Sequence, residues 1–342
     1  MKMSDQFINI INSLINQEDL SFKDMQSCMN QIMCGEINPI QISGFMVALQ
    51  IKGPTIDEIA AAAGVMREAS NKVNIKSRQN LIDTCGTGGD SLQTFNVSTL
   101  AAIVSASAGA IVAKHGGRSV SSKSGSADVL ESLGVNVNLN FSQLGRLVDD
   151  IGIGFMFAPN YHPAMKHVAP VRKELKLRTI FNLLGPLTNP ASAKNQVVGV
   201  YSKELTLVFA EVLKKLGSHH VLSVHGADGM DEISITGKTY IAELKNGKIL
   251  EYEFNPQDYG FKLGRIEDIE VANIESSKEM MLGILEGDKN TARDITILNS
   301  GAALYVSGIC PDFESAFEVS AQMIDEGLAL KKLSQLIKQS NE

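Results

Sequence analysis

The sequence predicts an α/β protein in which a small N-terminal helical domain precedes a larger α/β domain with a mainly parallel central sheet surrounded by helices. Apolar residues recur at helical spacing over the first seventy residues. From residue 81 onward, short apolar runs, glycine turns and helical segments alternate, which is typical of βαβ units. The final hundred residues return to helical patterns. We therefore expect a helical domain at residues 1–75 and an α/β domain at residues 76–342.

Several short amphipathic helices are predicted in the first domain. The apolar face of the first helix consists of Phe7, Ile10, Ile11, Leu14 and Ile15. Ser21 and Gly35 are placed to begin and end a second helix. Asn38, followed by Pro39, opens a third, and Thr55 caps a fourth. Because such helices must cover another apolar surface, we expect this bundle to be an interface.

The second domain alternates strands and helices. In chain order, the pattern predicts a strand at 81–85, a small-residue helix at 96–109, a strand at 110–113, a helix at 126–133, and strands at 153–157, 196–201 and 221–225. Asn246-Gly247 separates two further apolar runs, at 241–244 and 249–254. This pair predicts a β-hairpin added to the sheet.

Composition excludes several classes of protein. Hydrophobic residues make up 44% of the chain and charged residues 20%, and no apolar run approaches the ~20 residues of a membrane-spanning helix. The N-terminus lacks the pattern of a secretory signal, so we expect a cytoplasmic protein. Cys28, Cys34, Cys85 and Cys310 form no CxxC pair, and we expect buried thiols rather than disulfides or a zinc site.

The distribution of charge favours a small anionic substrate. A net charge of −7 opposes binding to nucleic acid, whose affinity for proteins comes largely from Lys and Arg. Residues 114–178 nevertheless carry a net +4, which leaves −11 on the rest of the chain. A basic segment within an acidic protein suits a small anion better than a polymer. Chance clustering on a solvated face is the alternative.

A glycine-rich loop follows the first predicted strand. Residues 83–90 read Asp-Thr-Cys-Gly-Thr-Gly-Gly-Asp. Glycines let the backbone approach a phosphate and present its N–H groups to it. The loop is not a P-loop, and Ser91 replaces the last glycine of a dinucleotide fingerprint. A phosphate cradle and a plain structural turn both remain open on this loop alone.

Two further segments carry groups that bind anions. Residues 94–99, Thr-Phe-Asn-Val-Ser-Thr, open a helix with hydroxyls and an amide where N–H groups are left unpaired. Residues 114–126 contain three cations, adjacent glycines and five serines directly after a strand, which suits a phosphate or diphosphate. A solvated linker is the alternative for this segment. His115 within it is expected to be a hydrogen-bonded loop residue rather than a general base.

Acidic residues follow the strand predicted at 221–225. Asp231 and Glu232 are adjacent within the segment His-Gly-Ala-Asp-Gly-Met-Asp-Glu, residues 225–232. Mg²⁺ prefers oxygen ligands and is commonly shared between one or two carboxylates and substrate phosphates. Beside phosphate-binding loops, this pair therefore suggests a magnesium site, although acidic turns are also common.

Together these segments resemble the anthranilate phosphoribosyltransferase family. The resemblance runs from the N-terminal helices to Leu304, and its motifs include residues 86–90, 96–99, 114–116, 125–128, 162–166, 178–190 and 225–234. It implies transfer of the phosphoribosyl group of 5-phosphoribosyl 1-diphosphate to anthranilate, with magnesium as cofactor. It also implies a homodimer formed through the helical domain, which helices near 162–190 would join.

By position, the resemblance assigns roles to individual residues. Those implied to bind phosphoribosyl diphosphate are Gly86, Gly89, Asp90, Thr94, Asn96, Val97, Ser98, Thr99, Lys114, His115, Gly116, Gly117, Arg118, Ser119, Val120, Ser121, Ser122 and Ser126. Those implied to bind anthranilate are Gly86, Gly117 and Arg172, where a guanidinium would match the carboxylate. Those implied to bind magnesium are Ser98, Asp231 and Glu232.

The chain departs from the family pattern at Gly117, where the family usually has asparagine. We therefore expect altered binding of the acceptor. Two other functions remain as alternatives. One is a pyrimidine nucleoside phosphorylase-like enzyme, which also handles ribose and phosphate; the other is a non-catalytic paralogue that binds nucleic acid, which the net charge opposes.

Overall fold

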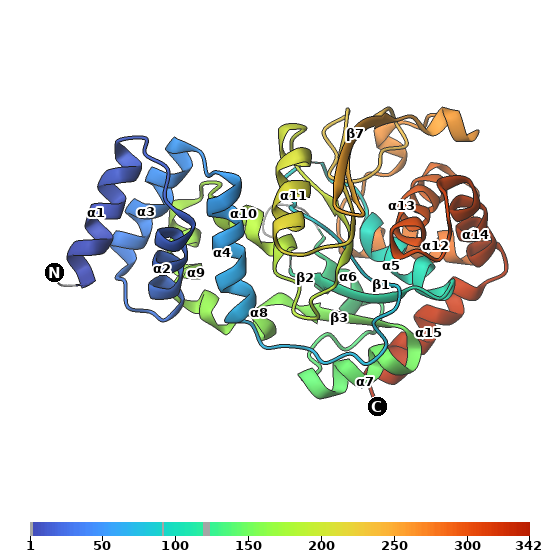
Figure 1. Ribbon diagram of the computed structural model, residues 1–342. Coiled ribbons are helices and arrows are strands. Elements are labelled where there is room, and N and C mark those ends of the chain that lie inside the picture. Colours follow the sequence, from blue (N-terminus) through green and yellow to red (C-terminus); the bar gives the residue numbers. More distant parts are fainter. Residues whose placement is uncertain (1–2, 91, 119–123) are drawn as a thin grey trace. The chain divides into compact units, whose positions relative to one another are not determined.

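The structure, a computed structural model, describes residues 3–90, 92–118 and 124–342 of the chain (Figure 1). Ser119, Val120, Ser121 and Ser122, predicted to bind phosphoribosyl diphosphate, lie outside the described residues. The chain divides into two compact units. A helical unit comprises Met1–Asn71 and Pro159–Pro190, and an α/β unit comprises Lys72–Ala158 and Ala191–Glu342.

Capping residues set the limits of the helices in the helical unit. These helices are α1 (Met3–Ile15), α2 (Phe22–Met33), α3 (Pro39–Lys52), α4 (Ile56–Glu68), α8 (Ala158–Tyr161), η1 (Pro163–His167), α9 (Ala169–Leu175), α10 (Ile180–Leu184) and η2 (Gly185–Leu187). The Ser21 side chain accepts a hydrogen bond from Asp24 N, and Thr55 forms a reciprocal capping box with Glu58. The caps predicted at Ser21, Asn38 and Thr55 are confirmed.

The prediction that all the cysteines are buried is wrong. Cys28 and Cys310 are buried, but Cys34 is exposed and Cys85 is partly exposed. Cys34 is the C-cap of α2, directly before Gly35 with its positive φ of 76°. The Cys34 side chain therefore faces solvent just beyond the last helical residue.

Within the described residues the α/β unit contains a seven-stranded sheet in the order β3-β2-β1-β4-β5-β6-β7. Its strands are β1 (Leu81–Gly86), β2 (Ile111–Gly116), β3 (Ile153–Phe157), β4 (Asn195–Gly199), β5 (His220–Gly226), β6 (Thr239–Lys245) and β7 (Lys248–Phe254). The first five are parallel, and β6 and β7 are antiparallel additions. Asn246 and Gly247 both adopt positive φ, as the predicted hairpin requires. The predicted fold class is confirmed.

Helices cover the sheet. They are α5 (Val97–Ser107), α6 (Ser126–Ser132), α7 (Phe141–Ile151), α11 (Glu204–Lys215), η3 (Pro256–Tyr259), η4 (Ile266–Asp268), α12 (Ile274–Glu286), α13 (Thr291–Ser307), α14 (Phe313–Asp325) and α15 (Leu328–Ser340). Helix α13 packs against α5, α14 and the strands β1, β4 and β5, whereas α11 packs against β5 and β6. Figure 1 shows α5 and α13 on the other side of the sheet from α11.

The strand order places a reversal of the sheet topology at the carboxyl ends of β1 and β4. Strand β1 lies between β2 and β4, so the chain connections leave it in opposite directions. In open α/β sheets such a reversal is where ligands bind. Glycines end the strands that surround it: Gly86 in β1, Gly116 in β2, Gly199 in β4 and Gly226 in β5. Without side chains there, the following loops can approach one another closely.

Candidate active site

Asp231 lies against the glycine-rich loop. Its Oδ2 accepts a hydrogen bond of 2.8 Å from Gly88 N. A Cβ atom on Gly86 would overlap the same Oδ2, and one on Gly199 would overlap the Asp231 carbonyl oxygen. Both positions therefore need glycine for Asp231 to lie between β1 and β4.

Glu232, Ser98 and Lys114 form a connected series of contacts. Glu232 Oε1 accepts a hydrogen bond of 3.1 Å from Ser98 N, in the first turn of α5. Lys114 Nζ donates to Ser98 Oγ at 3.1 Å and to the Thr84 carbonyl. Because Asp231 and Glu232 are adjacent, these bonds join the exits of β1, β2 and β5 into one site.

In this site Lys114 is buried and Asp90, Asp231 and Glu232 are half-buried, which changes their ionisation. Burial, with the nearby Asp231 carboxylate, raises the pKa of Asp90 to about 7 and that of Glu232 to about 8. Burial also raises the pKa of Asp231 and lowers that of Lys114, which is 3% exposed. Within this group of four, three carboxyl groups face one ammonium. The site is therefore short of positive charge when all three are ionised.

A divalent cation fits this imbalance. Carboxylate oxygens are the ligands that Mg²⁺ prefers, and its charge would favour their ionised form. Among the described residues, no three His, Cys, Asp or Glu side chains are arranged to hold a metal by themselves. Mg²⁺ commonly takes its remaining ligands from water and substrate phosphates.

The start of α5 differs from the sequence prediction of unpaired N–H groups. Val97 N donates to Phe95 O, Ser98 N to Glu232 and Thr99 N to the Asn96 carbonyl. Val97 and Thr99 themselves have buried side chains. The Glu232 carboxyl group therefore lies at this helix N-terminus, where it accepts the hydrogen bond from Ser98 N.

Asn96 is the N-cap of α5 by position, but its side chain does not cap the helix. Its Nδ2 instead donates to Ser124 O at 3.1 Å, and its Oδ1 accepts from Ser277 Oγ at 2.8 Å and from Ser124 Oγ at 2.7 Å. Thr94, before it, pairs with Glu270 in an isolated antiparallel bridge. Asn96 therefore ties the start of α5 to α12 and to the segment after residue 123.

Strand β2 is longer than predicted, because Lys114, His115 and Gly116 belong to it and pair with β3. The sequence prediction placed them in the following loop. His115 N donates to the buried Asp83 at 3.0 Å, and a Cβ on Gly116 would meet the Phe155 ring at 3.0 Å. Lys114 and His115 can continue this strand because their hydrogen-bond partners Thr84 and Asp83 lie on the neighbouring strand β1.

The segment after β2 is anchored to α6. Arg118 forms ion pairs of 2.7 Å with Asp128 and 2.6 Å with Glu131, so its guanidinium is directed toward acidic side chains. Gly117 has open space where a Cβ would stand. Ser126 begins α6, and its Cβ lies 3.3 Å from the position that a Cβ on Gly116 would take. Ser126 is therefore beside the end of β2.

Arg172 belongs to the helical unit, in α9. Burial lowers the pKa of its guanidinium. Binding of the anthranilate carboxylate by Arg172 stays a prediction.

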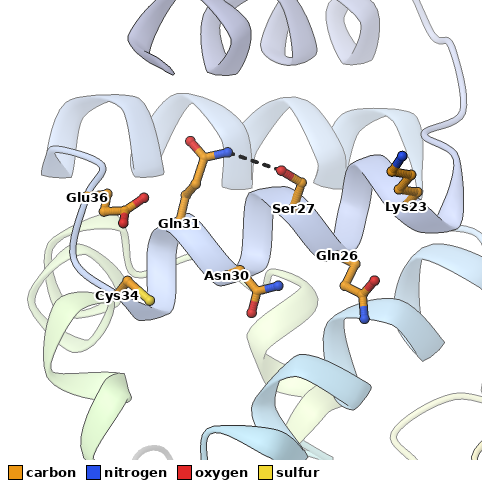
Figure 2. A pocket seen from close by; sticks show the side chains of 7 residues that line it. All are labelled: Lys23, Gln26, Ser27, Asn30, Gln31, Cys34 and Glu36. Atoms are coloured by element: carbon orange, nitrogen blue, oxygen red, sulfur yellow. Dashed lines mark hydrogen bonds between the residues drawn. The ribbon is translucent and has the colours of Figure 1, made fainter. Parts of the chain in front are cut away.

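The helical unit also contains a hollow of about 330 Å³ beside α2. Figure 2 shows Lys23, Ser27 and Gln31 on one side of this helix and Gln26, Asn30 and Cys34 on the other, with Gln31 Nε2 donating to Ser27 Oγ at 3.3 Å. None of the predicted site residues lines it.

Sequence reasoning missed several residues that hold the site together. Gly199 makes room for Asp231, Asp83 binds His115 N, and Asn299 binds the backbone of Ile233, next to Glu232. An asparagine within the apolar pattern of residues 291–307 was a signal that could have been noticed. Gly199 carried no such local signal.

Comparison with known proteins agrees with this geometry. Residues 78–330 match the α/β domain of a glycosyl transferase family, and residues 8–70 match its helical bundle domain. An anthranilate phosphoribosyltransferase from Methylobacillus flagellatus is 54% identical over 323 residues, which cover 94% of this chain and 95% of the relative. The chain belongs to the anthranilate phosphoribosyltransferase family.

Solved anthranilate phosphoribosyltransferases have the same fold. The enzyme from Thermus thermophilus matches with a TM-score of 0.92 and 38% identity, covering 97% of this chain and 99% of that one. The enzyme from Saccharomyces cerevisiae, solved in complex with PRPP and Mg, matches with a TM-score of 0.89 and 28% identity, covering 98% of each chain. No helix in the described residues has the length and apolar composition needed to cross a membrane.

Proposed function

We propose that this protein transfers the phosphoribosyl group of 5-phosphoribosyl 1-diphosphate to anthranilate, giving N-(5-phosphoribosyl)anthranilate and pyrophosphate in tryptophan biosynthesis. The observation that carries the proposal is the hydrogen-bonded connection of Gly88 to Asp231, and of the adjacent Glu232 to Ser98 and Lys114. It brings a glycine-rich loop, a helix N-terminus, a buried ammonium and two carboxylates to one edge of the sheet, as binding of a sugar diphosphate requires.

In this reaction the loop at 86–90 and the first turn of α5 bind the phosphates of the donor. The hydroxyl groups in these segments suit phosphate oxygens. Lys114, which is buried and bonded to Ser98, is proposed to act with them. Asp231 and Glu232, with Ser98, would hold Mg²⁺. When bound, Mg²⁺ neutralises the charge that develops on the departing diphosphate.

The acceptor needs no protein nucleophile, because the aromatic amine itself attacks the ribosyl carbon. The protein contributes by holding the two substrates together. Effective-molarity measurements show that good orientation of reacting groups can lower the activation free energy by up to about 7–11 kcal/mol. Arg172 is the group we propose for the anthranilate carboxylate, with Gly86 and Gly117 lining the acceptor.

We also propose that the protein is a cytoplasmic homodimer that associates through its helical unit. Ile15 on α1 is 61% exposed, and Ile40 and Ile51 on α3 are 84% and 72% exposed. Large apolar side chains so open to water are typical of surfaces that another subunit covers.

The test is the fading of anthranilate fluorescence when the purified protein is mixed with 5-phosphoribosyl 1-diphosphate and Mg²⁺. Each component is omitted in turn, and we expect fading only in the complete mixture. Release of free base from thymidine or uridine with phosphate, without fading of anthranilate, would instead support a nucleoside phosphorylase.

A further inference from the structure

Asn299 is a buried polar residue in the middle of α13, 3% exposed. Asparagine is a poor residue for a helix interior, because its side chain competes for backbone hydrogen bonds. Here the side chain makes three of them. Oδ1 accepts from Ile233 N at 3.0 Å, and Nδ2 donates to Ile233 O at 2.9 Å and to Ile295 O at 3.0 Å.

The two bonds to Ile233 fix the backbone next to Glu232. Ile233 is fully buried and lies outside the helices and strands, so its N–H and C=O have no partner from secondary structure. Left unbonded, these groups would each be costly to bury. The Ile233 N–H shares a rigid peptide plane with the Glu232 carbonyl. By holding that plane, Asn299 fixes the direction in which the Glu232 side chain leaves the backbone.

Asp228 holds the other end of the same turn. Its Oδ1 accepts from Met230 N at 3.0 Å, and its Oδ2 accepts from Ser234 Oγ at 2.6 Å and from Thr236 Oγ1 at 2.5 Å. The turn that presents Asp231 and Glu232 is thus closed on itself by Asp228 and anchored to α13 by Asn299.

We propose that Asn299 is a positioning residue, which keeps the Asp231 and Glu232 carboxylates at the spacing that a divalent cation requires. The inference rests on the proposed function, in which these two carboxylates hold Mg²⁺. Residues that orient the ligands of a metal commonly contribute 10–100-fold to its affinity. Asn299 acts through the backbone of Ile233 and touches neither substrate nor cation.

The experiment uses the full chain with Asn299→Ala, Asn299→Asp and, as a matched control, Thr296→Val. Thr296 is buried in the same helix, but its hydroxyl donates to Ala292 O within α13. The Asp variant keeps the shape and an acceptor for Ile233 N, but it loses the donor to the two carbonyls. Thermal unfolding will show whether the Ala variant folds. If it does not, the Asp variant replaces it in the measurements.

Two readouts separate positioning from general stability. Binding of Mn²⁺ alone, followed by the electron paramagnetic resonance of the free ion, is expected to weaken about 10–100-fold in both Asn299 variants and to be unchanged in Thr296→Val. In turnover assays, the KM for Mg²⁺ is expected to rise by a similar factor, with a smaller loss of kcat at saturating Mg²⁺.

A folded Asn299 variant that binds Mn²⁺ as the unchanged protein does would overturn the proposal, as would an unchanged protein that binds no Mn²⁺. The proposed function is judged separately by whether the unchanged protein forms product. A protein that binds Mn²⁺ but makes no product would refute the function, while the Mn²⁺ titrations would still decide the role of Asn299.

Discussion

Asp231 Oδ2 accepts a 2.8 Å hydrogen bond from Gly88 N, although 143 residues separate them along the chain. This contact joins the loop after β1 to the turn after β5. It exists because Gly86 and Gly199 have no Cβ atoms that would occupy the same space. The geometry of the site thus depends on the absence of side chains at these two glycines as well as on the hydrogen-bonding groups.

Replacing the carboxylates should reduce activity more than stability. In Asp231→Asn and Glu232→Gln the amide oxygens can still accept from Gly88 and Ser98, and a costly buried charge is removed. We expect kcat/KM to fall roughly 100-fold, the loss of several kcal/mol of charge stabilisation, with a melting temperature no lower than that of the unchanged protein. Full activity in both variants would contradict the metal assignment. Glu251→Gln, at an exposed position on β7, is the control.

The glycines around Asp231 should tolerate no side chain. A Cβ on Gly199 would overlap the Asp231 backbone, and we expect Gly199→Ala to lose about 3 kcal/mol of unfolding free energy, the upper range for overpacking. In Gly86→Ala the overlap is with the Asp231 carboxylate, so kcat/KM should fall more than stability. Gly237→Ala, where a Cβ would meet nothing within 4 Å, is the control for denaturant unfolding. Equal behaviour of the three variants would refute the packing argument.

Gly117→Asn tests the departure from the family pattern. Among the described residues no heavy atom lies within 4 Å of a Cβ at this position, so a Cβ is accommodated there. If the amide binds the acceptor, the KM for anthranilate should fall roughly tenfold, the value of one good hydrogen bond, while the KM for phosphoribosyl diphosphate stays the same. An unchanged KM for anthranilate would remove the hypothesis.

Glu243 should make stability depend on pH outside the active site. Burial opposes its ionisation, but hydrogen bonds from His220, Tyr305 and Tyr252 outweigh this and lower its pKa. Because the pKa is lower in the folded protein, the stabilisation is present above the ordinary Glu pKa of about 4.3 and is lost as pH falls through the folded value.

Glu243→Gln should therefore cost about 1–2 kcal/mol at pH 7 and less at pH 3. Urea unfolding across this pH range measures both values. A difference between variant and unchanged protein that does not vary with pH would contradict the expectation.

Ile40→Glu should weaken the proposed dimer. Ile40 is 84% exposed on α3, and a carboxylate there would be costly to bury against a second subunit. We expect sedimentation equilibrium to show a shift from dimer toward monomer at low micromolar protein. Leu250→Glu, at a residue on β7 that is 65% exposed, is the matched control and should leave the mass unchanged.

Turns and helix caps could be predicted from the sequence, because they depend on residues that are close together in the chain. Asn246-Gly247 specifies a turn through its own backbone preferences, and Thr55 and Glu58 cap α4 within one helical turn. These features could be predicted because their physical cause is local.

Long-range contacts could not be predicted in the same way. Asn299 forms a hydrogen bond with Ile233, which lies 66 residues away in the chain. Neither residue type indicates which residue its partner is. The hydrogen bonds of the Lys114 ammonium to Thr84 and Ser98 were not predicted either; they form because β2 extends beside β1. The extent of a strand depends on its neighbours, which a single sequence does not identify.

The antiparallel hairpin also determines the character of one edge of the sheet. It makes β7 an outer strand, with Lys248, Glu251 and Glu253 open to water. Charged side chains along such an edge discourage another molecule from adding its own strand there. The hairpin thus gives this edge of the sheet a charged outer strand that opposes fibre-like growth from it.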